Sequence, residues 1–556
     1  MPTSLKVLIL GGYGTFGGRL ARLLADEPRL SLIIAGRSLV KAQDFCGTFA
    51  HSAALEPAIF DRDGDVERQL AALAPDIVVD ASGPFQMYGD PYKVIRAALS
   101  LGIGYLDLAD GSDFVKGVAQ FDEQAKARGI YVLSGVSSFP VLTAAVTRRL
   151  AAGMSRVDTV TGGIAPSPYA GVGLNVIRAI ASYAGKPIAI PRAGTHYALV
   201  EARRYTIAPP GFVPLRPVRF SLVDVPDLQV IPELWPSPRM IWIGAGPVPG
   251  ILHRALNMLA LLVRGRVLRS LSPFAPMMFR AINVLRWGEH RGGMFVAVEG
   301  AGIDGRPLTR SWHLLAEGDD GPLIPSMAAE AIIRRCLEGR PPTPGARAAI
   351  GDLELADYEA LFARRTIFTG IREQAEAAAP LYRRLLGSAW TTLPQPIRAL
   401  HDLQSTLTAQ GMATVERGRG WLARVVASLF RFPQAGQEIP VAVVFTRDGG
   451  RETWRRKFAG RGFVSTQEEG RRRFEHLLCE RFGPLAFGLA LAVKEQRLHL
   501  VVRGWSFLGI PLPLALAPGG EAFEAVDAGR FAFSVEIAHP WTGLIVRYRG
   551  TLDLVS

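Results

Sequence analysis

The first 150 residues alternate between short apolar runs and longer amphipathic stretches. An apolar run over 5–10 precedes glycines at 11, 12, 14 and 17, leucines at helical spacing follow, and a second apolar run covers 32–35. This order predicts strand, glycine turn, helix and strand. Further helices are expected near 39–50, 64–73, 91–102 and 113–128, and further strands near 56–60, 76–80, 105–108 and 130–134. Strands alternating with helices predict a doubly wound parallel sheet, so 1–150 is expected to be a Rossmann domain of the α/β class.

The pattern becomes richer in strands after residue 150. A helix is expected over 171–184, and a last helix over 325–339 that returns to the first domain. Strands are expected over 157–164, 195–207, 218–224, 239–244, 294–300 and 308–315. Residues 151–345 therefore predict an α+β substrate domain.

Another change of pattern separates the last third of the chain. Residues 346–379 are interpreted as a connecting segment, and 380–556 as a separate C-terminal antiparallel β domain with helices. Helices are expected over 379–387 and 417–431, and strands over 439–446, 451–458, 485–494, 497–505, 531–538 and 543–554. The sequence Arg447-Asp448-Gly449-Gly450 between the first two strands is typical of a hairpin.

The glycine turn carries the most specific chemistry. Gly12, Gly14 and Gly17 form a G-x-G-x-x-G pattern between a predicted strand and a predicted helix. Gly12 is expected to permit the tight turn, Gly14 to let the main chain approach a pyrophosphate, and Gly17 to let the helix pack closely. The helix N-terminus would offer free N–H groups to the phosphates. The residues expected to bind the dinucleotide here are Gly11, Gly12, Gly14, Thr15, Phe16 and Gly17.

The end of the second strand indicates which dinucleotide binds. NAD-binding units usually place Asp or Glu there, whereas this chain has Gly36, Arg37 and Ser38. A guanidinium and a hydroxyl suit a 2′-phosphate, which a carboxylate would repel. We therefore expect NADP(H), with Arg37 and Ser38 at the 2′-phosphate.

Two further positions are expected to border the dinucleotide. The loop after the fourth strand, including Ser82, Gly83 and Pro84, should lie on the nicotinamide side of the crevice. Asp61 follows the third strand, where a polar side chain could reach the adenine; it is equally well explained as the N-cap of the helix over 64–73.

Composition narrows the function classes. The net charge is +13, and the excess of basic residues lies after residue 150. No apolar stretch is long enough for a spanning helix, the first strand begins at residue 5, and the three cysteines are far apart. We therefore expect a cytoplasmic protein with reduced thiols. No metal-ligand spacing, nucleophile elbow or nucleic-acid motif is evident, so neither a metal nor nucleic acid is expected.

Four blocks of sequence resemble the saccharopine dehydrogenase-like (saccharopine reductase-like) oxidoreductases. The blocks are GGYGTFGGRLA, AGRS, VVDASGPFQMYGDPYKVIRAALSLGIGYLDLADG and SWHLLAEGDDGPLIPSMAAEAII, and the resemblance covers roughly 5–375. It implies an NADP-binding Rossmann domain and hydride chemistry on a C=C, C=N or C=O bond. The C-terminal part resembles a bacterial domain of unknown function that is fused behind such reductases.

The acid–base group is harder to locate. Members of that family commonly carry Gly-Glu where this chain has Asp110-Gly111, which puts any role of that glutamate in doubt. Hydride transfer needs a proton partner, and the candidates are Tyr88, Asp107, Asp110 and His313. Each residue taken alone is more often structural, as a helix cap, a core tyrosine or a hydrogen-bonded histidine.

An apolar block dotted with arginines covers 251–287. It predicts peripheral contact with the inner face of a membrane or a lipid-sized pocket, and a buried helix pair is the alternative. The leading hypothesis is an NADP(H)-dependent oxidoreductase that acts on a small hydrophobic substrate, such as a lipid or polyketide enoyl group, rather than on an amino-acid imine. By resemblance, trans-acting enoyl reductases are a precedent. The rival is a non-catalytic module that senses NADPH and binds a membrane or ligand. The oligomeric state is left open.

Overall fold

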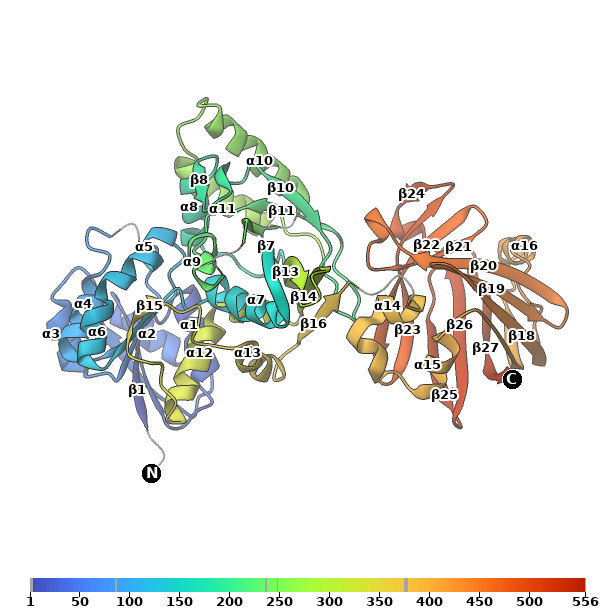
Figure 1. The fold of residues 1–556 in the computed structure, drawn as a ribbon, viewed down its shortest axis with the longest axis horizontal. Coiled ribbons are helices and arrows are strands. Elements are labelled where there is room, and N and C mark those ends of the chain that lie inside the picture. Colours follow the sequence, from blue (N-terminus) through green and yellow to red (C-terminus); the bar gives the residue numbers. More distant parts are fainter. Residues whose placement is uncertain (1–3, 86–87, 236–237, 248, 375–378, 556) are drawn as a thin grey trace. The chain divides into compact units, whose positions relative to one another are not determined.

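The computed structural model describes residues 4–85, 88–235, 238–247, 249–374 and 379–555. They form two compact units, each considered by itself (Figure 1). Unit 1 comprises Met1–Tyr205 and Val218–Phe368, and unit 2 comprises Thr206–Pro217 and Thr369–Ser556. Unit 1 contains two sheets, and unit 2 is built around a third.

The first sheet of unit 1 is parallel and has the strand order β15-β6-β5-β4-β1-β2-β3. Its order reverses at β1, as the Rossmann prediction requires, so the expected fold class is confirmed. The strands are β1 (Leu5–Leu10), β2 (Leu30–Gly36), β3 (Ala54–Ile59), β4 (Ile77–Asp80), β5 (Gly104–Asp107), β6 (Tyr131–Ser134) and β15 (Gly345–Ala348).

Helices cover both faces of this sheet. Leu8 and Leu10 of β1 cluster with Val94 and Ile95 of α4, while the intervening Ile9 is buried as well. Successive strand side chains point to opposite faces, so burial of both sets requires two helical layers. The helices are α1 (Thr15–Leu24), α2 (Leu39–Cys46), α3 (Val66–Leu73), α4 (Lys93–Leu101), α5 (Ser112–Gly117) and α6 (Asp122–Arg128). The next helix, α7 (Thr143–Ala151), packs against strands of the second sheet.

The second sheet of unit 1 is mixed, with the order β10-β11-β12-β7-β13-β14-β16. Its strands are β7 (Met154–Ala165), β10 (Ala202–Tyr205), β11 (Val218–Leu222), β12 (Met240–Ala245), β13 (Gly292–Gly302), β14 (Pro307–Ala316) and β16 (Ile367–Glu373). A small hairpin of β8 (Pro187–Ile190) and β9 (Gly194–Tyr197) lies outside it. The associated helices are α8 (Leu174–Tyr183), α9 (Asp227–Leu234), α10 (Gly250–Arg264), α11 (Ala275–Val284), α12 (Ile324–Leu337) and α13 (Leu355–Phe362).

The expected return of the last helix to the Rossmann domain is confirmed. Ser326 at the start of α12 donates its hydroxyl to the Phe16 carbonyl of α1 at 3.1 Å. Near the other end, Arg334 donates to the Leu23 carbonyl at 3.0 Å and pairs with Asp26. The chain then adds β15 to the first sheet and β16 to the second, so the segment expected as a connector over 346–379 contains regular structure.

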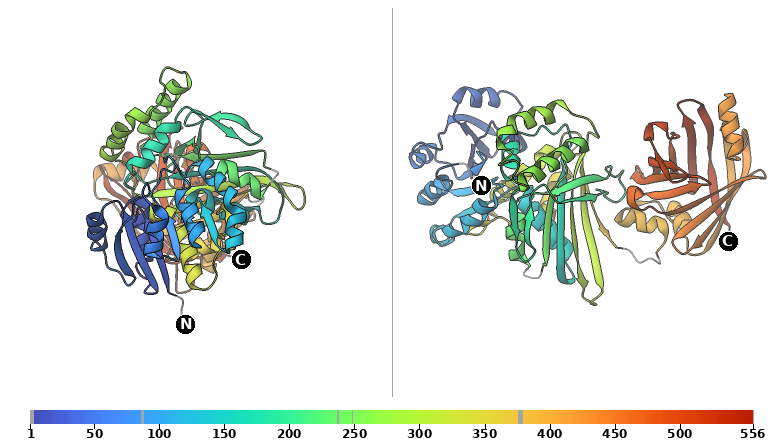
Figure 2. Two further views of the ribbon diagram at one scale, coloured as in Figure 1. Left: turned by 90° about the vertical axis from the view of Figure 1, so that its left-hand side faces the viewer. Right: turned by 90° about the horizontal axis from the view of Figure 1, so that it is seen from above.

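Unit 2 is a closed antiparallel sheet. The order runs β22-β21-β20-β19-β18-β17-β27-β26-β25-β23, and β22 also pairs with β23, which closes a barrel of ten strands with β24 at one edge (Figure 2). The strands are β17 (Thr406–Arg417), β18 (Gly436–Asp448), β19 (Arg451–Phe458), β20 (Arg461–Glu469), β21 (Leu478–Phe482), β22 (Leu485–Lys494), β23 (Arg497–Phe507), β24 (Ile510–Leu512), β25 (Ala522–Asp527), β26 (Arg530–His539) and β27 (Gly543–Val555). Its helices are α14 (Leu381–Leu386), α15 (Gln395–His401) and α16 (Trp421–Leu429).

Two element predictions were wrong in detail. The single strand expected over 195–207 is divided into β9 and β10 because Leu199 has a φ of 59°, outside the extended region. The helix expected over 113–128 is divided into α5 and α6 by a 3₁₀ turn, Val118–Phe121. The antiparallel β domain with helices predicted for the C-terminal part is confirmed.

Candidate functional site

A cavity of about 700 Å³ opens at the carboxyl edge of the parallel sheet. Two helix N-termini meet there: α1 begins after Gly14, α8 begins after Gly173, and a Cβ on Gly173 would lie 3.1 Å from the Thr15 hydroxyl. Free N–H groups and positive dipole ends at both helices favour an anionic ligand. Most of the residues predicted to bind the dinucleotide line this cavity, namely Gly11, Gly14, Thr15, Phe16, Arg37, Asp61, Ser82, Gly83 and Pro84.

The glycine turn is too crowded for side chains. The residue in the left-handed region is Gly11, with a φ of 72°. The sequence had led us to expect that Gly12 permits the tight turn. A Cβ on Gly12 would lie 2.8 Å from the Ile9 carbonyl oxygen, and a Cβ on Gly17 only 2.3 Å from that of Gly11. Gly12 and Gly17 therefore permit close packing behind the turn, while Gly14 faces the cavity.

Tyr13 explains why no carboxylate ends the second strand. A Cβ on Gly36 would lie 2.5 Å from the Tyr13 hydroxyl, so the tyrosine side chain fills the space that a side chain at position 36 would need. The same hydroxyl accepts a hydrogen bond from the Ser38 N–H at 3.1 Å. Ser38 does not line the cavity, and its side chain caps α2 by accepting from the Lys41 N–H at 3.4 Å.

Arg37 is the cation at this end of the cavity. Its side chain is exposed and lines the cavity, and it forms no hydrogen bond or ion pair with any residue that the structure describes. A guanidinium presents five N–H donors in a planar fork that matches phosphate oxygens. Arg37 is thus available to a phosphate group on a ligand.

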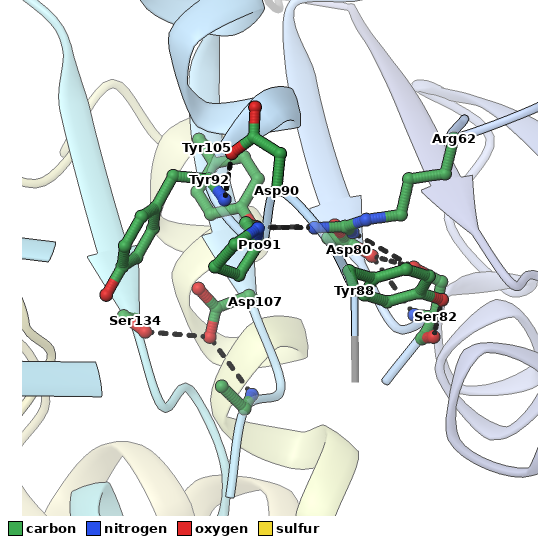
Figure 3. A network of polar contacts seen from close by, with 11 residues as sticks. Arg62, Asp80, Ser82, Tyr88, Asp90, Pro91, Tyr92, Tyr105, Asp107 and Ser134 are labelled. Carbon is green, nitrogen blue, oxygen red and sulfur yellow. Dashed lines mark hydrogen bonds and ion pairs between the residues drawn. The ribbon is translucent and has the colours of Figure 1, made fainter. Parts of the chain in front are cut away.

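A buried ion pair supports the part of the cavity wall that the Ser82–Pro84 loop forms (Figure 3). Arg62 pairs with Asp80 at the end of β4 and donates to the Ser82 hydroxyl at 3.1 Å. The ring of Tyr88 lies 4.3 Å from the guanidinium, and the Tyr88 hydroxyl donates to the Ser82 carbonyl at 2.6 Å. Burial of a charge requires a paired partner, so this network fixes the Ser82–Pro84 loop against the sheet.

Asp107 also belongs to the sheet edge but faces inward (Figure 3). Its Oδ1 accepts from the N–H groups of Ala109 at 3.0 Å and Gly135 at 2.9 Å and from the Ser134 hydroxyl at 3.0 Å. The side chain is fully buried, and burial raises its pKa to about 7. Asp107 does not line the cavity, and its hydrogen bonds tie the ends of β5 and β6 together.

The other acid–base candidates separate clearly by position. Asp110 and Tyr88 line the cavity. Asp110 is reachable from the cavity, yet the surrounding protein removes enough water to raise its pKa, and the Asp224 carboxylate acts in the same direction. His313 is fully buried in β14 and lies 2.9 Å from the Ser311 hydroxyl, away from the cavity lining.

Asp61 lines the cavity, and its suggested alternative role as a helix cap was wrong. The cap of α3 is Asp65, which accepts from the Arg68 N–H at 3.1 Å. Asp61 instead accepts from the Asp63 N–H at 3.0 Å within the loop. Because Asp65 caps α3, the Asp61 carboxylate is not needed at the N-terminus of that helix and can face the cavity.

Several residues that line this cavity could not be identified as site residues from the sequence. Tyr13, Arg62, Asn175 and Arg178 all border the cavity. Asn175 donates to the Gly83 carbonyl at 3.4 Å, which joins α8 to the Ser82–Pro84 loop. The position of Arg62 just after β3 could have suggested that it belongs to the site. Its partner Asp80 lies on a different strand, β4, so their pairing is visible only in the folded chain.

A smaller apolar cavity adjoins the first. It measures about 220 Å³ and shares Thr15, Phe16, Gly173 and Val176 with the larger cavity. Its remaining lining residues are mainly apolar, among them Ile164, Met294, Leu314 and Ile324. A polar ligand in the large cavity would thus lie next to an apolar recess.

Comparison with known proteins gives one family match and several similar structures. Residues 393–552 match the model "Domain of unknown function (DUF4166)". This confirms the expected domain of unknown function. No curated protein matches the chain.

The similar solved structures include dehydrogenases. Saccharopine dehydrogenase (L-Glu forming) from Saccharomyces cerevisiae is 15% identical, with 67% of this chain and 100% of that chain covered and a TM-score of 0.46. The WlbA (WbpB) dehydrogenase from Thermus thermophilus, solved with NAD and alpha-ketoglutarate, is 14% identical over 65% and 93%, with a TM-score of 0.28. A probable dehydrogenase from Thermotoga maritima is 10% identical over 66% and 98%, with a TM-score of 0.32. The first of these bears the name of the family that the sequence motifs resemble.

Among the described residues, none of the helices combines the length and apolar character needed to cross a bilayer. The same residues contain no group of three or more His, Cys, Asp or Glu side chains placed to hold a metal ion.

Proposed function

We propose that the protein is an NADP(H)-dependent oxidoreductase of the saccharopine dehydrogenase-like type. The observation that carries the proposal is a single cavity lined by the Gly11–Phe16 turn, Arg37 and the Ser82–Pro84 loop. The crevice at the carboxyl ends of the strands, where their order reverses, is where doubly wound sheets bind dinucleotides. When bound, the nicotinamide supplies the hydride equivalent for reduction of a C=C, C=N or C=O bond.

The cofactor would be held along the length of the cavity. Gly14, Thr15 and the N-terminus of α8 would bind the pyrophosphate, and Arg37 the 2′-phosphate. NADP(H) is favoured over NAD(H) because Tyr13 occupies the place of an acidic side chain at Gly36. The Ser82–Pro84 loop, held by Arg62, would orient the nicotinamide end.

The substrate would be hydrophobic. The recess beside Phe16 suits an acyl or polyketide-like chain, because most of its lining is apolar and its charged residues already bind one another or the main chain: His290 pairs with Asp319, and Arg19 donates to the Ala170 carbonyl. Asp110 would provide the proton: it lines the cavity, and its raised pKa favours the protonated form more than an ordinary aspartate. Tyr88, whose single hydroxyl hydrogen is donated to the Ser82 carbonyl, would hold the Ser82–Pro84 loop in position.

We also propose that the protein is cytoplasmic and contacts a membrane surface through 251–287. On α10, the Ile251 side chain is 65% exposed and the Met258 side chain 68%. On and after α11, Val284 is 78% exposed and Trp287 49%. Arginines lie between these residues, so the segment offers apolar side chains to lipid and cations to anionic headgroups.

Purified full-length protein should consume NADPH with an enone or imine substrate from a broad panel. Asp110→Asn should lower the rate by about a hundredfold, while Asp113→Asn, an exposed aspartate that does not line the cavity, should leave the rate unchanged. Tight NADPH binding without turnover of any substrate would instead favour the rival sensing module. Absence of NADPH binding would refute both.

A further inference from the structure

The barrel of unit 2 encloses an apolar cavity of about 220 Å³. Inward-facing residues from many of its strands form the walls, among them Val443, Phe487, Leu500, Val502 and Phe533. Protein interiors are normally packed without voids larger than a water molecule. An apolar void of about 150 Å³ already suffices to bind benzene. The interior of this barrel is therefore large enough to receive a ligand.

We propose that this cavity binds the hydrocarbon chain of a fatty-acyl compound. The site is separate from the dinucleotide cavity, because every residue of its lining belongs to unit 2. The lining is dominated by aliphatic and aromatic side chains, which exclude water and cannot replace the hydrogen bonds of a polar ligand. An acyl chain fits such a surface and needs few polar partners.

One polar cluster on the wall provides a place for the acyl head. Arg456 of β19 lines the cavity, donates to the Ser465 hydroxyl at 2.8 Å and pairs with Glu480 at 3.3 Å. Glu480 also accepts from Gln467 at 3.1 Å. A guanidinium has five N–H donors, so Arg456 retains donors for a carboxyl or carbonyl oxygen while Glu480 holds it in place. Two other carboxylates, Glu524 and Glu536, also line the cavity, but they are bound to His401 at 2.6 Å and to Arg547 at 2.8 Å, so Arg456 is the cationic side chain of the lining.

Helix α16 extends the apolar character from the cavity to the surface. Val426 and Phe430, at one face and the end of the helix, contribute to the cavity wall. Other side chains of the same helix are apolar and exposed: the Trp421 side chain is 68% exposed, and that of Leu429 is 75% exposed. Apolar side chains therefore continue along this helix from the cavity wall to the surface.

The test uses the full-length protein and octanoic acid, whose short chain matches the volume of the cavity, with binding measured by isothermal titration calorimetry. Leu500→Trp would fill the cavity, whereas Val501→Trp, the adjacent residue on β23, changes the outer face where Val501 is 36% exposed. We expect saturable binding to the native protein, weakened by about tenfold or more in Leu500→Trp and unchanged in Val501→Trp.

Several results would overturn the proposal. These are absence of saturable binding by the native protein, or equal binding by Leu500→Trp and the native protein. Circular dichroism and urea unfolding report whether each variant is folded; if Leu500→Trp is not, Val502→Phe replaces it with a smaller increase in volume. Lipid extraction of the purified protein followed by mass spectrometry gives an independent readout, in which a stoichiometric acyl compound supports the proposal. NADPH binding that persists without fatty-acid binding would reject this inference alone.

Discussion

Arg37 offers the sharpest test of the cofactor assignment. Its guanidinium lines the dinucleotide cavity and has no partner among the residues that the structure describes. A hydrogen bond to a charged group contributes about 1.5–3 kcal/mol, which corresponds to roughly tenfold to a hundredfold in affinity. Because Arg37 is exposed, solvent and salt screen the contact, so we expect the lower part of that range.

The perturbation is Arg37→Gln, which removes the charge but keeps a hydrogen-bonding side chain. The dissociation constant for NADPH should rise about tenfold while that for NADH stays within about twofold. Arg37→Asp should shift the preference further, because a carboxylate repels the 2′-phosphate. Arg68→Gln is the matched control, since Arg68 is an exposed arginine of the same domain that does not line the cavity.

Isothermal titration calorimetry of each variant with both nucleotides gives the measurement. The preference of the native protein for NADPH should also decrease as ionic strength rises, because the contact is electrostatic. An unchanged NADPH-to-NADH ratio in Arg37→Asp would refute the assignment of the 2′-phosphate to this residue. A comparable loss in Arg68→Gln would show that overall charge, rather than a specific contact, governs binding.

Three stability predictions can be checked by urea unfolding. Gly17→Ala should cost about 1–3 kcal/mol and weaken NADPH binding, because the new Cβ would meet a backbone oxygen at 2.3 Å; Gly89→Ala, with no atom within 4 Å, should be neutral. Arg62→Met should cost about 3 kcal/mol by leaving Asp80 buried without its cation, and Asp80→Asn should restore part of the loss. Burial raises the pKa of Asp107 to about 7, so the native state keeps this proton after the unfolded chain has lost it. Asp107 should therefore lower the stability by up to about 4 kcal/mol between pH 4 and 7. Asp107→Asn should remove this contribution and make the slope shallower, while Asp227, whose pKa burial also raises to about 7, keeps its own; an equal slope in both proteins would contradict the assignment.

The sequence alone determined the parts of this protein that depend on local order. Strands buried on both faces appear as continuous apolar runs, and the glycines stand between strand and helix, so the Rossmann unit and its turn could be predicted. The position of Arg37 just after β2 is likewise a property of the chain order.

Strands with polar inward side chains escaped prediction. In β20, the inward-facing Ser465 and Gln467 are almost fully buried, and in β21 Glu480 faces the same interior. These groups hydrogen-bond to one another across strands, which satisfies them but removes the alternation of apolar and polar residues. The closure of the barrel could therefore not be predicted from the sequence, because it depends on pairing between β22 and β23 and on partners distant in sequence.

Only the tertiary structure decided which candidate residues reach the cavity. Asp107 and Asp110 lie three positions apart after the same strand, yet one is sealed between β5 and β6 and the other faces the cavity. Arg62 and Asp80 meet only because β3 and β4 lie in one sheet and a loop folds over their ends. Spacing along a chain fixes the side on which a strand residue points, but whether water, a ligand or another strand lies on that side depends on how distant segments pack.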